Sequence, residues 1–297
     1  MNRIVFKGTC TAAVTPFTKD GIDYEAFKKQ IDFQVNGGVD AIAVLGTTGE
    51  AAALTDDEYE GVARFAKEHI NGRVKFILGC GSNCTIKAIK RSVFAEKLGA
   101  DGILAVTPYY NKCTQKGLVK YYGEICKSVS LPVIAYNVPA RTGVNALPET
   151  LAEIAEYPNM CGVKEASGDI RQIAEAARLL RGKIAFYAGD DALNLPALKL
   201  GSSGVISVVS NIFPKETCDI ARLYFEGKYA LSEAAQQKLT PMIRAAFIEV
   251  NPIPIKAAME YAGLCSARVR SPLTPLEFKH RATLLNAMYG LGARVSV

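Results

Sequence analysis

Short apolar segments recur along the chain at intervals of about 30 residues, the length of one strand–helix unit. Each segment is bounded by turn-forming or polar residues, and each except the last is followed by a helical pattern. We predict eight strands, at Thr11–Val14, Ala41–Leu45, Lys75–Gly79, Gly102–Val106, Pro132–Tyr136, Gly162–Lys164, Ile184–Ala188 and Val205–Val208. Strands that are apolar throughout fit a parallel sheet covered on both faces, and eight alternating units favour closure into a (β/α)8 TIM barrel. A doubly wound open sheet is the alternative α/β architecture.

Apolar residues return every three or four positions in the intervening segments, which is typical of amphipathic helices. This spacing predicts helices at Tyr24–Asn36, Asp56–His69, Ile86–Leu98, Lys116–Ser128, Pro148–Ala155 and Gln172–Leu180. Asp23, Thr55 and Thr85 are the predicted N-caps. Only helical patterns follow the last strand, at Glu216–Phe225, Ala230–Glu249 and Pro254–Ala262. We therefore expect residues 1–213 to form the barrel that carries the active site, and residues 214–297 to form a C-terminal helical domain.

Composition excludes several classes of function. The 297 residues are 49% hydrophobic and 22% charged, and the net charge of +6 is scattered without a basic block, so nucleic-acid binding has little support. Eight dispersed cysteines and only two histidines give no ligand cluster, so we expect reduced thiols and no metal site. No apolar run reaches the roughly 18 residues of a membrane span, and no signal peptide is evident, so we expect a cytoplasmic protein.

Lys164 is the best candidate for chemistry. It closes the apolar run Cys161–Lys164 and is followed at once by the polar segment Glu165–Gly168. Desolvation disfavours an ammonium, and a neutral amine can attack a ketone to form a Schiff base. The alternative is a lysine that only extends from a strand end to solvent.

Other reactive side chains follow neighbouring predicted strands. In a closed barrel, the residues after the C-terminal strand ends share one rim, where the active site lies. The segments Gly46–Glu50, Thr107–Asn111 and Tyr136–Gly143 bring threonines, tyrosines and an arginine to the rim that Lys164 occupies. Each segment alone could be a turn or a packing contact, but their shared register predicts a functional site.

These segments together resemble the dihydrodipicolinate synthase family, a group of pyruvate-dependent class I aldolases and lyases. The resemblance rests on Gly46–Glu50, Tyr109–Asn111, Tyr136–Gly143, Gly162–Gly168, Gly204–Ser207 and Asn251–Lys256. It implies a lyase that condenses pyruvate with L-aspartate 4-semialdehyde to 4-hydroxy-tetrahydrodipicolinate, in the biosynthesis of diaminopimelate and lysine. It also implies that no cofactor is needed, since a protein amine supplies the electron sink.

The resemblance further implies roles for individual residues. Lys164 would form the iminium with pyruvate, and Tyr136 would exchange protons beside it, linked through Thr47 to Tyr110. The substrate-binding residues would be Thr48, Arg141, Gly189 and Ile206, with Arg141 holding the semialdehyde carboxylate in a bidentate contact. Glu50 and the Asn251–Pro252 pair are taken to be structural.

The resemblance also implies assembly, because Tyr110 would enter the neighbouring subunit's site across a tight dimer. A homotetramer made of two tight dimers is expected. Many family members are inhibited by lysine at that interface, but this chain has Asp56 and Tyr59 where histidines are usual and Lys87 where a glutamate is usual. Two like charges about 4 Å apart repel by roughly 4 kcal/mol at an effective dielectric near 20, so we predict weak or absent inhibition. The alternative is that Asp56 supplies the missing negative charge.

Two other functions stay open. One is a sugar-acid aldolase such as N-acetylneuraminate lyase, which shares the iminium but binds polyhydroxylated substrates. Arg141 together with Tyr110 favours a small aldehyde that carries a carboxylate. The other is a catalytically silent keto-acid-binding homologue, which the intact set of Lys164, Tyr136, Thr47 and Tyr110 argues against.

Overall fold

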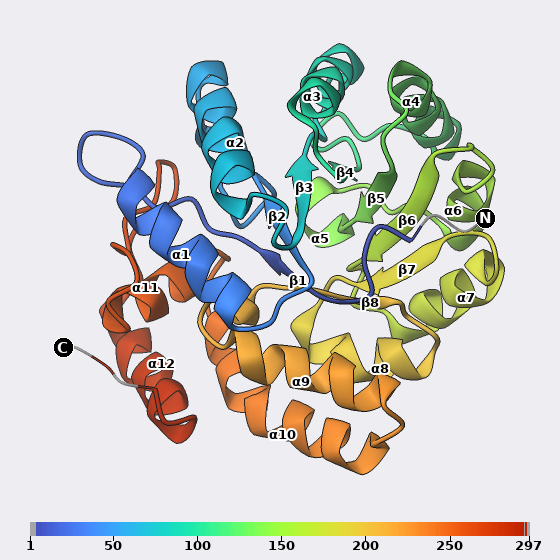
Figure 1. Cartoon of the computed structure of the whole chain (residues 1–297). Coiled ribbons are helices and arrows are strands. Elements are labelled where there is room, and N and C mark those ends of the chain that lie inside the picture. Colours follow the sequence, from blue (N-terminus) through green and yellow to red (C-terminus); the bar gives the residue numbers. More distant parts are fainter. Residues whose placement is uncertain (1–3, 294, 296–297) are drawn as a thin grey trace. The chain divides into compact units, whose positions relative to one another are not determined.

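The computed structural model describes residues 4–293 and 295. Its strands are parallel and close into a barrel in the order β1 to β8, as the sequence predicts. Figure 1 shows the elements coloured along the chain. The strands are β1 (Gly8–Ala12), β2 (Ala41–Val44), β3 (Lys75–Gly79), β4 (Gly102–Val106), β5 (Val133–Asn137), β6 (Met160–Glu165), β7 (Ala185–Ala188) and β8 (Gly204–Ser207).

Helices alternate with the strands and then continue alone to the C-terminal part of the chain. Those between strands are α1 (Tyr24–Asn36), α2 (Asp56–Ile70), α3 (Thr85–Leu98), α4 (Gln115–Ser128), α5 (Pro139–Thr142), α6 (Pro148–Ile154), α7 (Ile170–Leu180) and α8 (Asn194–Lys199). After β8 follow α9 (Pro214–Phe225), α10 (Tyr229–Ala246), α11 (Ile253–Tyr261) and α12 (Phe278–Gly290). Short 3-10 turns are η1 (Ala51–Ala53), η2 (Asp191–Leu193) and η3 (Val209–Asn211).

Two of the three predicted N-caps are confirmed. The Asp23 carboxylate accepts from the backbone N–H of Ala26 at 2.9 Å, and Thr55 forms a capping box with Glu58. The prediction for Thr85 is wrong, because α3 begins at this residue and Cys84 is its N-cap without a side-chain hydrogen bond. A polar residue at the start of a helical pattern marks the boundary only to within a residue or two.

The chain forms two compact units, which we describe separately. The first unit comprises the described residues up to Gly8 and Lys75–Ile206, and the second comprises Thr9–Val74 and the chain from Ser207 onward. The first predicted C-terminal helix does begin near residue 214, as α9. The division into a barrel of residues 1–213 and a helical domain of residues 214–297 stays a prediction.

The first unit contains strands β3 to β7, β8 as far as Ile206, and helices α3 to α8. Its strands are buried along nearly their whole length, which agrees with their continuous apolar sequence. Residues such as Ile173, Phe186 and Val205 form a core between α7 and the outer side of β7 and β8. This packing holds β7 and β8 against α7 and α8 within the first unit.

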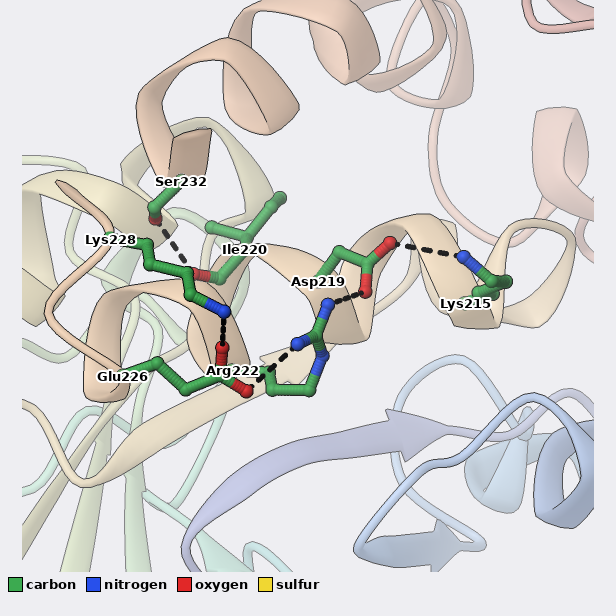
Figure 2. Close-up of polar contacts among 7 residues, drawn as sticks. All are labelled: Lys215, Asp219, Ile220, Arg222, Glu226, Lys228 and Ser232. Carbon is green, nitrogen blue, oxygen red and sulfur yellow. Dashed lines mark hydrogen bonds and ion pairs between the residues drawn. The ribbon is translucent and has the colours of Figure 1, made fainter. Parts of the chain in front are cut away.

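The second unit contains β1, β2, α1, α2 and the C-terminal helices α9 to α12. Helices α9 and α10 pack side by side, and the buried Ser232 hydroxyl joins them by donating to the carbonyl of Ile220 at 2.7 Å (Figures 1 and 2). A ladder of ion pairs runs along the outer side of α9 through Asp219 and Arg222 to Glu226, the residue that caps the helix. Exposed ion pairs are screened by solvent, so this ladder adds little to stability.

None of the helices within the described residues combines the length and hydrophobicity that crossing a membrane requires.

Candidate functional site

Lys164 lies inside the first unit, next to Tyr136. It is the fifth residue of β6, and only 4% of its surface is exposed. Tyr136 pairs with it in register on β5, so both side chains point to the same side of the sheet. The Lys164 Nζ lies 4.3 Å from the centre of the Tyr136 ring. The structure therefore brings a buried amine and a phenol together at the ends of adjacent strands.

Gly189 gives the lysine the space it occupies. It follows β7, and its backbone N–H donates to the Glu165 carbonyl at 2.8 Å. A Cβ at this position would lie 3.0 Å from Lys164 Cε and 2.8 Å from Ala166 Cβ, closer than carbon atoms normally approach. The position therefore needs glycine, because any side chain would press against the aliphatic stem of Lys164. Ile206, the other predicted main-chain contact, is 1% exposed on β8.

A polar network lies directly behind the Lys164–Tyr136 pair. Asn137 and Glu165, the next residues on β5 and β6, are also paired in register, and successive strand residues face opposite sides of a sheet. The Asn137 Nδ2 donates to Glu165 Oε2 at 3.0 Å and to Asn145 Oδ1 at 2.9 Å. The Ser167 backbone N–H donates to Glu165 Oε1 at 2.7 Å. These bonds tie together the two strand ends that carry the amine and the phenol.

The charge state of Glu165 follows from competing effects. Burial raises the pKa of its carboxyl group, and the hydrogen bonds from Asn137 and Ser167 offset this rise only in part. Its two oxygens accept from N–H donors, which favours the ionised form and so opposes the effect of burial. Neither Glu165 nor Asn137 was predicted from the sequence. The available signal was their position, since each directly follows a candidate catalytic residue on its strand.

Arg141 lies in the short helix after β5, and Tyr110 lies in the loop after β4, which is hydrogen-bonded to that helix. Arg141 is exposed in the short helix α5, which begins at Pro139 after β5. The Tyr110 backbone N–H donates to the Thr142 carbonyl at 3.3 Å, which connects the loop after β4 to α5. The Tyr110 side chain is 88% exposed, and its backbone has a positive φ of 74°. A bulky residue in the left-handed region is rare and often marks a functional position.

The two predicted threonines belong to the second unit, where they follow β2. Thr47 is half-buried, and its carbonyl accepts from the Glu50 backbone N–H at 3.1 Å. Thr48 is 3% exposed, and its Oγ1 accepts from Asn251 Nδ2 at 3.0 Å. Thr48 is thus held by the C-terminal region, a contact that the sequence analysis did not predict.

The residues expected to govern inhibition by lysine lie on helices α2 and α3. Lys87 is exposed on α3 of the first unit. Asp56 is exposed in the first turn of α2 in the second unit, whereas Tyr59 on the same helix is 2% exposed. In the part of the chain that the structure describes, no three His, Cys, Asp or Glu side chains gather in a way that could hold a metal ion.

The residues around Lys164 are suited to covalent chemistry with a carbonyl compound. A buried amine can add to a carbonyl carbon, and a phenol at its side can move protons to and from the adduct. The glycine at position 189 keeps the amine's stem free, while Glu165 and Asn137 hold the strand ends in place. These are the parts that a Schiff-base enzyme needs in its protein scaffold.

The chain is similar to known proteins over nearly its whole length. A 4-hydroxy-tetrahydrodipicolinate synthase from Caldicellulosiruptor saccharolyticus is 46% identical over 292 residues, which cover 98% of this chain and 99% of that protein. The crystal structure of a dihydrodipicolinate synthase from Thermotoga maritima is 42% identical with a TM-score of 0.95, covering 97% of this chain and 99% of that one. The dihydrodipicolinate synthase from Cyanidioschyzon merolae, solved with lysine bound, is 36% identical with a TM-score of 0.94. The match covers 98% of this chain and 100% of that one.

The family-level match has the same extent. Residues 5–289 match the dihydrodipicolinate synthetase family. This range includes every candidate site residue, from Thr47 after β2 to Ile206 on β8. The chain therefore belongs to the dihydrodipicolinate synthetase family.

Proposed function

We propose that this chain is a lyase that condenses pyruvate with L-aspartate 4-semialdehyde to 4-hydroxy-tetrahydrodipicolinate, in the biosynthesis of diaminopimelate and lysine. The observation that carries the proposal is the buried Lys164 Nζ, 4.3 Å from the Tyr136 ring centre at the ends of paired strands. The relatives that share nearly the full length of the chain carry the name of this activity.

The reaction starts at the Lys164 amine. Its nitrogen attacks the keto carbon of pyruvate, and loss of one water leaves an iminium whose positive nitrogen draws electrons from the adjacent methyl group. A methyl proton then leaves, with the Tyr136 phenol as the proposed carrier, and the resulting enamine attacks the aldehyde carbon of the semialdehyde. The amino group of the semialdehyde next attacks the imine carbon and displaces Lys164, which closes the ring. One water is lost overall, and the enzyme is regenerated.

The remaining site residues have supporting roles in this proposal. Thr47 and Tyr110 continue the proton path from Tyr136. Thr48 binds the pyruvate carboxylate, and the backbone around Gly189 and Ile206 lines the keto-acid site. Arg141 binds the semialdehyde carboxylate, for which a planar guanidinium offers two parallel donors.

We further propose that the chain works as a homo-oligomer, built from tight dimers that pair into a tetramer. The supporting observation is Tyr110, whose ring is 88% exposed on a backbone held in the left-handed region. An aromatic ring held outward in this way suits insertion into a neighbouring subunit. We also propose a cytoplasmic location, since the eight cysteines are free thiols, as is usual in a reducing compartment.

Weak or absent inhibition by lysine is part of the proposal. Lys87 is exposed on α3 and would repel the ammonium groups of the effector. Activity titrated with lysine should therefore change little at sub-millimolar concentrations. In the variant Lys87→Glu, sensitivity to lysine should increase. Strong inhibition of the unmodified enzyme would instead indicate that Asp56 supplies the compensating charge.

Trapping with borohydride tests the central step. Incubation with pyruvate and borohydride should reduce the imine to a stable secondary amine, and peptide mass mapping should locate it at Lys164. Lys256 is the internal control, since it is 0% exposed and buried in an ion pair, and it should stay unmodified. Lys164→Ala should abolish the adduct.

Turnover assays then separate the possible functions. Condensation of pyruvate with the semialdehyde supports the proposal. Cleavage of sialic acid in its place would identify a sugar-acid aldolase, and an adduct without either turnover would identify a silent keto-acid binder. Absence of any adduct would rule out all Schiff-base chemistry at this lysine.

A further inference from the structure

The turn that carries Thr48 is conformationally strained at both ends. Leu45 enters it with φ of 60°, and Glu50 leaves it with φ of 53°, so two non-glycine residues occupy the left-handed region within six positions. Such residues are energetically unfavourable and persist only where the surroundings hold them. Gly49 leaves little room for a side chain, because a Cβ would lie 3.1 Å from Leu45 N and 3.2 Å from the Ala13 carbonyl oxygen.

Buried contacts of the second unit hold the end of this turn. The Lys256 Nζ donates to Glu50 Oε1 at 2.6 Å and to the Arg268 carbonyl at 2.6 Å, and the Arg270 backbone N–H donates to Glu50 Oε2 at 2.8 Å. The Phe17 ring packs against the charged groups of Lys256 and Arg270, and its centre lies 3.9 Å from Lys256 Nζ. The turn is therefore locked from its Glu50 end by the C-terminal region.

Asn251 makes a further contact, directly to Thr48. Its Nδ2 donates to Thr48 Oγ1 at 3.0 Å, and the two residues are only 5% and 3% exposed. A hydroxyl group has one proton and two lone pairs. Because the amide occupies a lone pair of Thr48, the hydroxyl proton must point away from Asn251. A carboxylate in the position of Asn251 would instead attract that proton.

We propose that Asn251 is a positioning residue that orients the Thr48 hydroxyl to donate its proton to the carboxylate of the bound keto acid. The inference rests on the proposed function and deepens it, since it explains how a buried threonine becomes a committed donor for an anionic substrate. A threonine without this partner would divide its proton among several acceptors. The strained, locked turn keeps Thr48 Oγ1 within reach of the amide.

The test compares pyruvate binding in variants of both residues. Asn251→Ala should raise the KM for pyruvate about tenfold, the effect of losing one hydrogen bond to a charged group, with a much smaller change in kcat. Asn251→Asp has nearly the same shape and should raise KM further, because its carboxylate takes the Thr48 proton. Should the Asp variant fail to fold, Asn251→Ala alone carries the test.

Two variants of Thr48 show whether Asn251 acts through the Thr48 hydroxyl or only supports the fold. Thr48→Ser keeps the hydroxyl, so Asn251→Ala should still raise KM in that background. Thr48→Val removes the hydroxyl with little change in shape, so Asn251→Ala should then have no further effect on KM. An equal effect of Asn251→Ala in both backgrounds, or an unchanged KM, would overturn the inference.

The same variants distinguish this inference from the proposed function. Borohydride trapping at Lys164 is measured as a function of pyruvate concentration. If the unmodified enzyme traps pyruvate but Asn251→Ala has the same concentration dependence, the inference fails and the function stands. If the unmodified enzyme traps no pyruvate, both fail.

Discussion

Removal of the Lys256 ammonium should be among the most damaging single changes to the stability of this protein. Lys256 is 0% exposed, and its partner Glu50 has a side chain only 2% exposed. In the variant Lys256→Met the aliphatic stem is kept, but Glu50 loses the partner of its Oε1 and retains only the Arg270 N–H on Oε2. Burial lowers the pKa of Lys256, and the ion pair with Glu50, at 2.6 Å, offsets that shift only in part.

The expected loss of stability comes from the Glu50 carboxylate, which would stay buried without its cationic partner. Breaking a buried ion pair by removing one partner costs about 3–5 kcal/mol, because a desolvated charge is left behind. Replacing both partners by neutral groups costs much less. The double variant Glu50→Gln with Lys256→Met should therefore be more stable than Lys256→Met alone, since a neutral amide still accepts from the Arg270 N–H.

Urea unfolding followed by circular dichroism measures the stability of each variant. The unfolding midpoints are compared once the dependence of the unfolding free energy on urea concentration is shown to be the same in all variants. Glu226→Gln is the matched control, since it breaks ion pairs in the exposed ladder of Figure 2 and should leave the midpoint almost unchanged. A double variant less stable than the single variant would refute the reasoning. In that case the carboxylate of Glu50 would be sufficiently stabilised by its remaining contacts, such as the Arg270 N–H, without the lysine ammonium.

Two further predictions concern the other carboxylates. Glu165→Gln should lower kcat for condensation about tenfold, because the amide has one acceptor for two donors and the strand ends loosen; an unchanged kcat would contradict a role for this network. The hydrogen bond from Arg270 holds the pKa of Glu58 below its ordinary value of 4.5. The ionised Glu58 therefore stabilises the folded state fully above pH 4.5, and this stabilisation is lost as the pH falls through the lowered pKa. The stability difference between the unmodified enzyme and Arg270→Gln, measured by urea unfolding, should therefore narrow below pH 4.5, and a constant difference would contradict the assignment.

Local sequence patterns predicted most of the secondary structure. The helix Tyr24–Asn36 is found with the predicted bounds, and strands Lys75–Gly79 and Gly102–Val106 are likewise unchanged. These patterns succeed because a strand or helix is decided by periodicities of two and 3.6 residues within a short window. Thr85 shows the limit, since a polar residue near a helix start cannot by itself locate the cap.

The sequence by itself determined the βα alternation and placed Lys164 and Tyr136 at the ends of neighbouring strands. Only the tertiary structure decided which distant side chains hold the turn after β2. Asn251 contacts Thr48 across 203 positions and Lys256 contacts Glu50 across 206, and no local pattern reports such pairs. The physical reason is that a contact between distant segments depends on the path of the whole folded chain, whereas a strand or helix depends on its immediate neighbours.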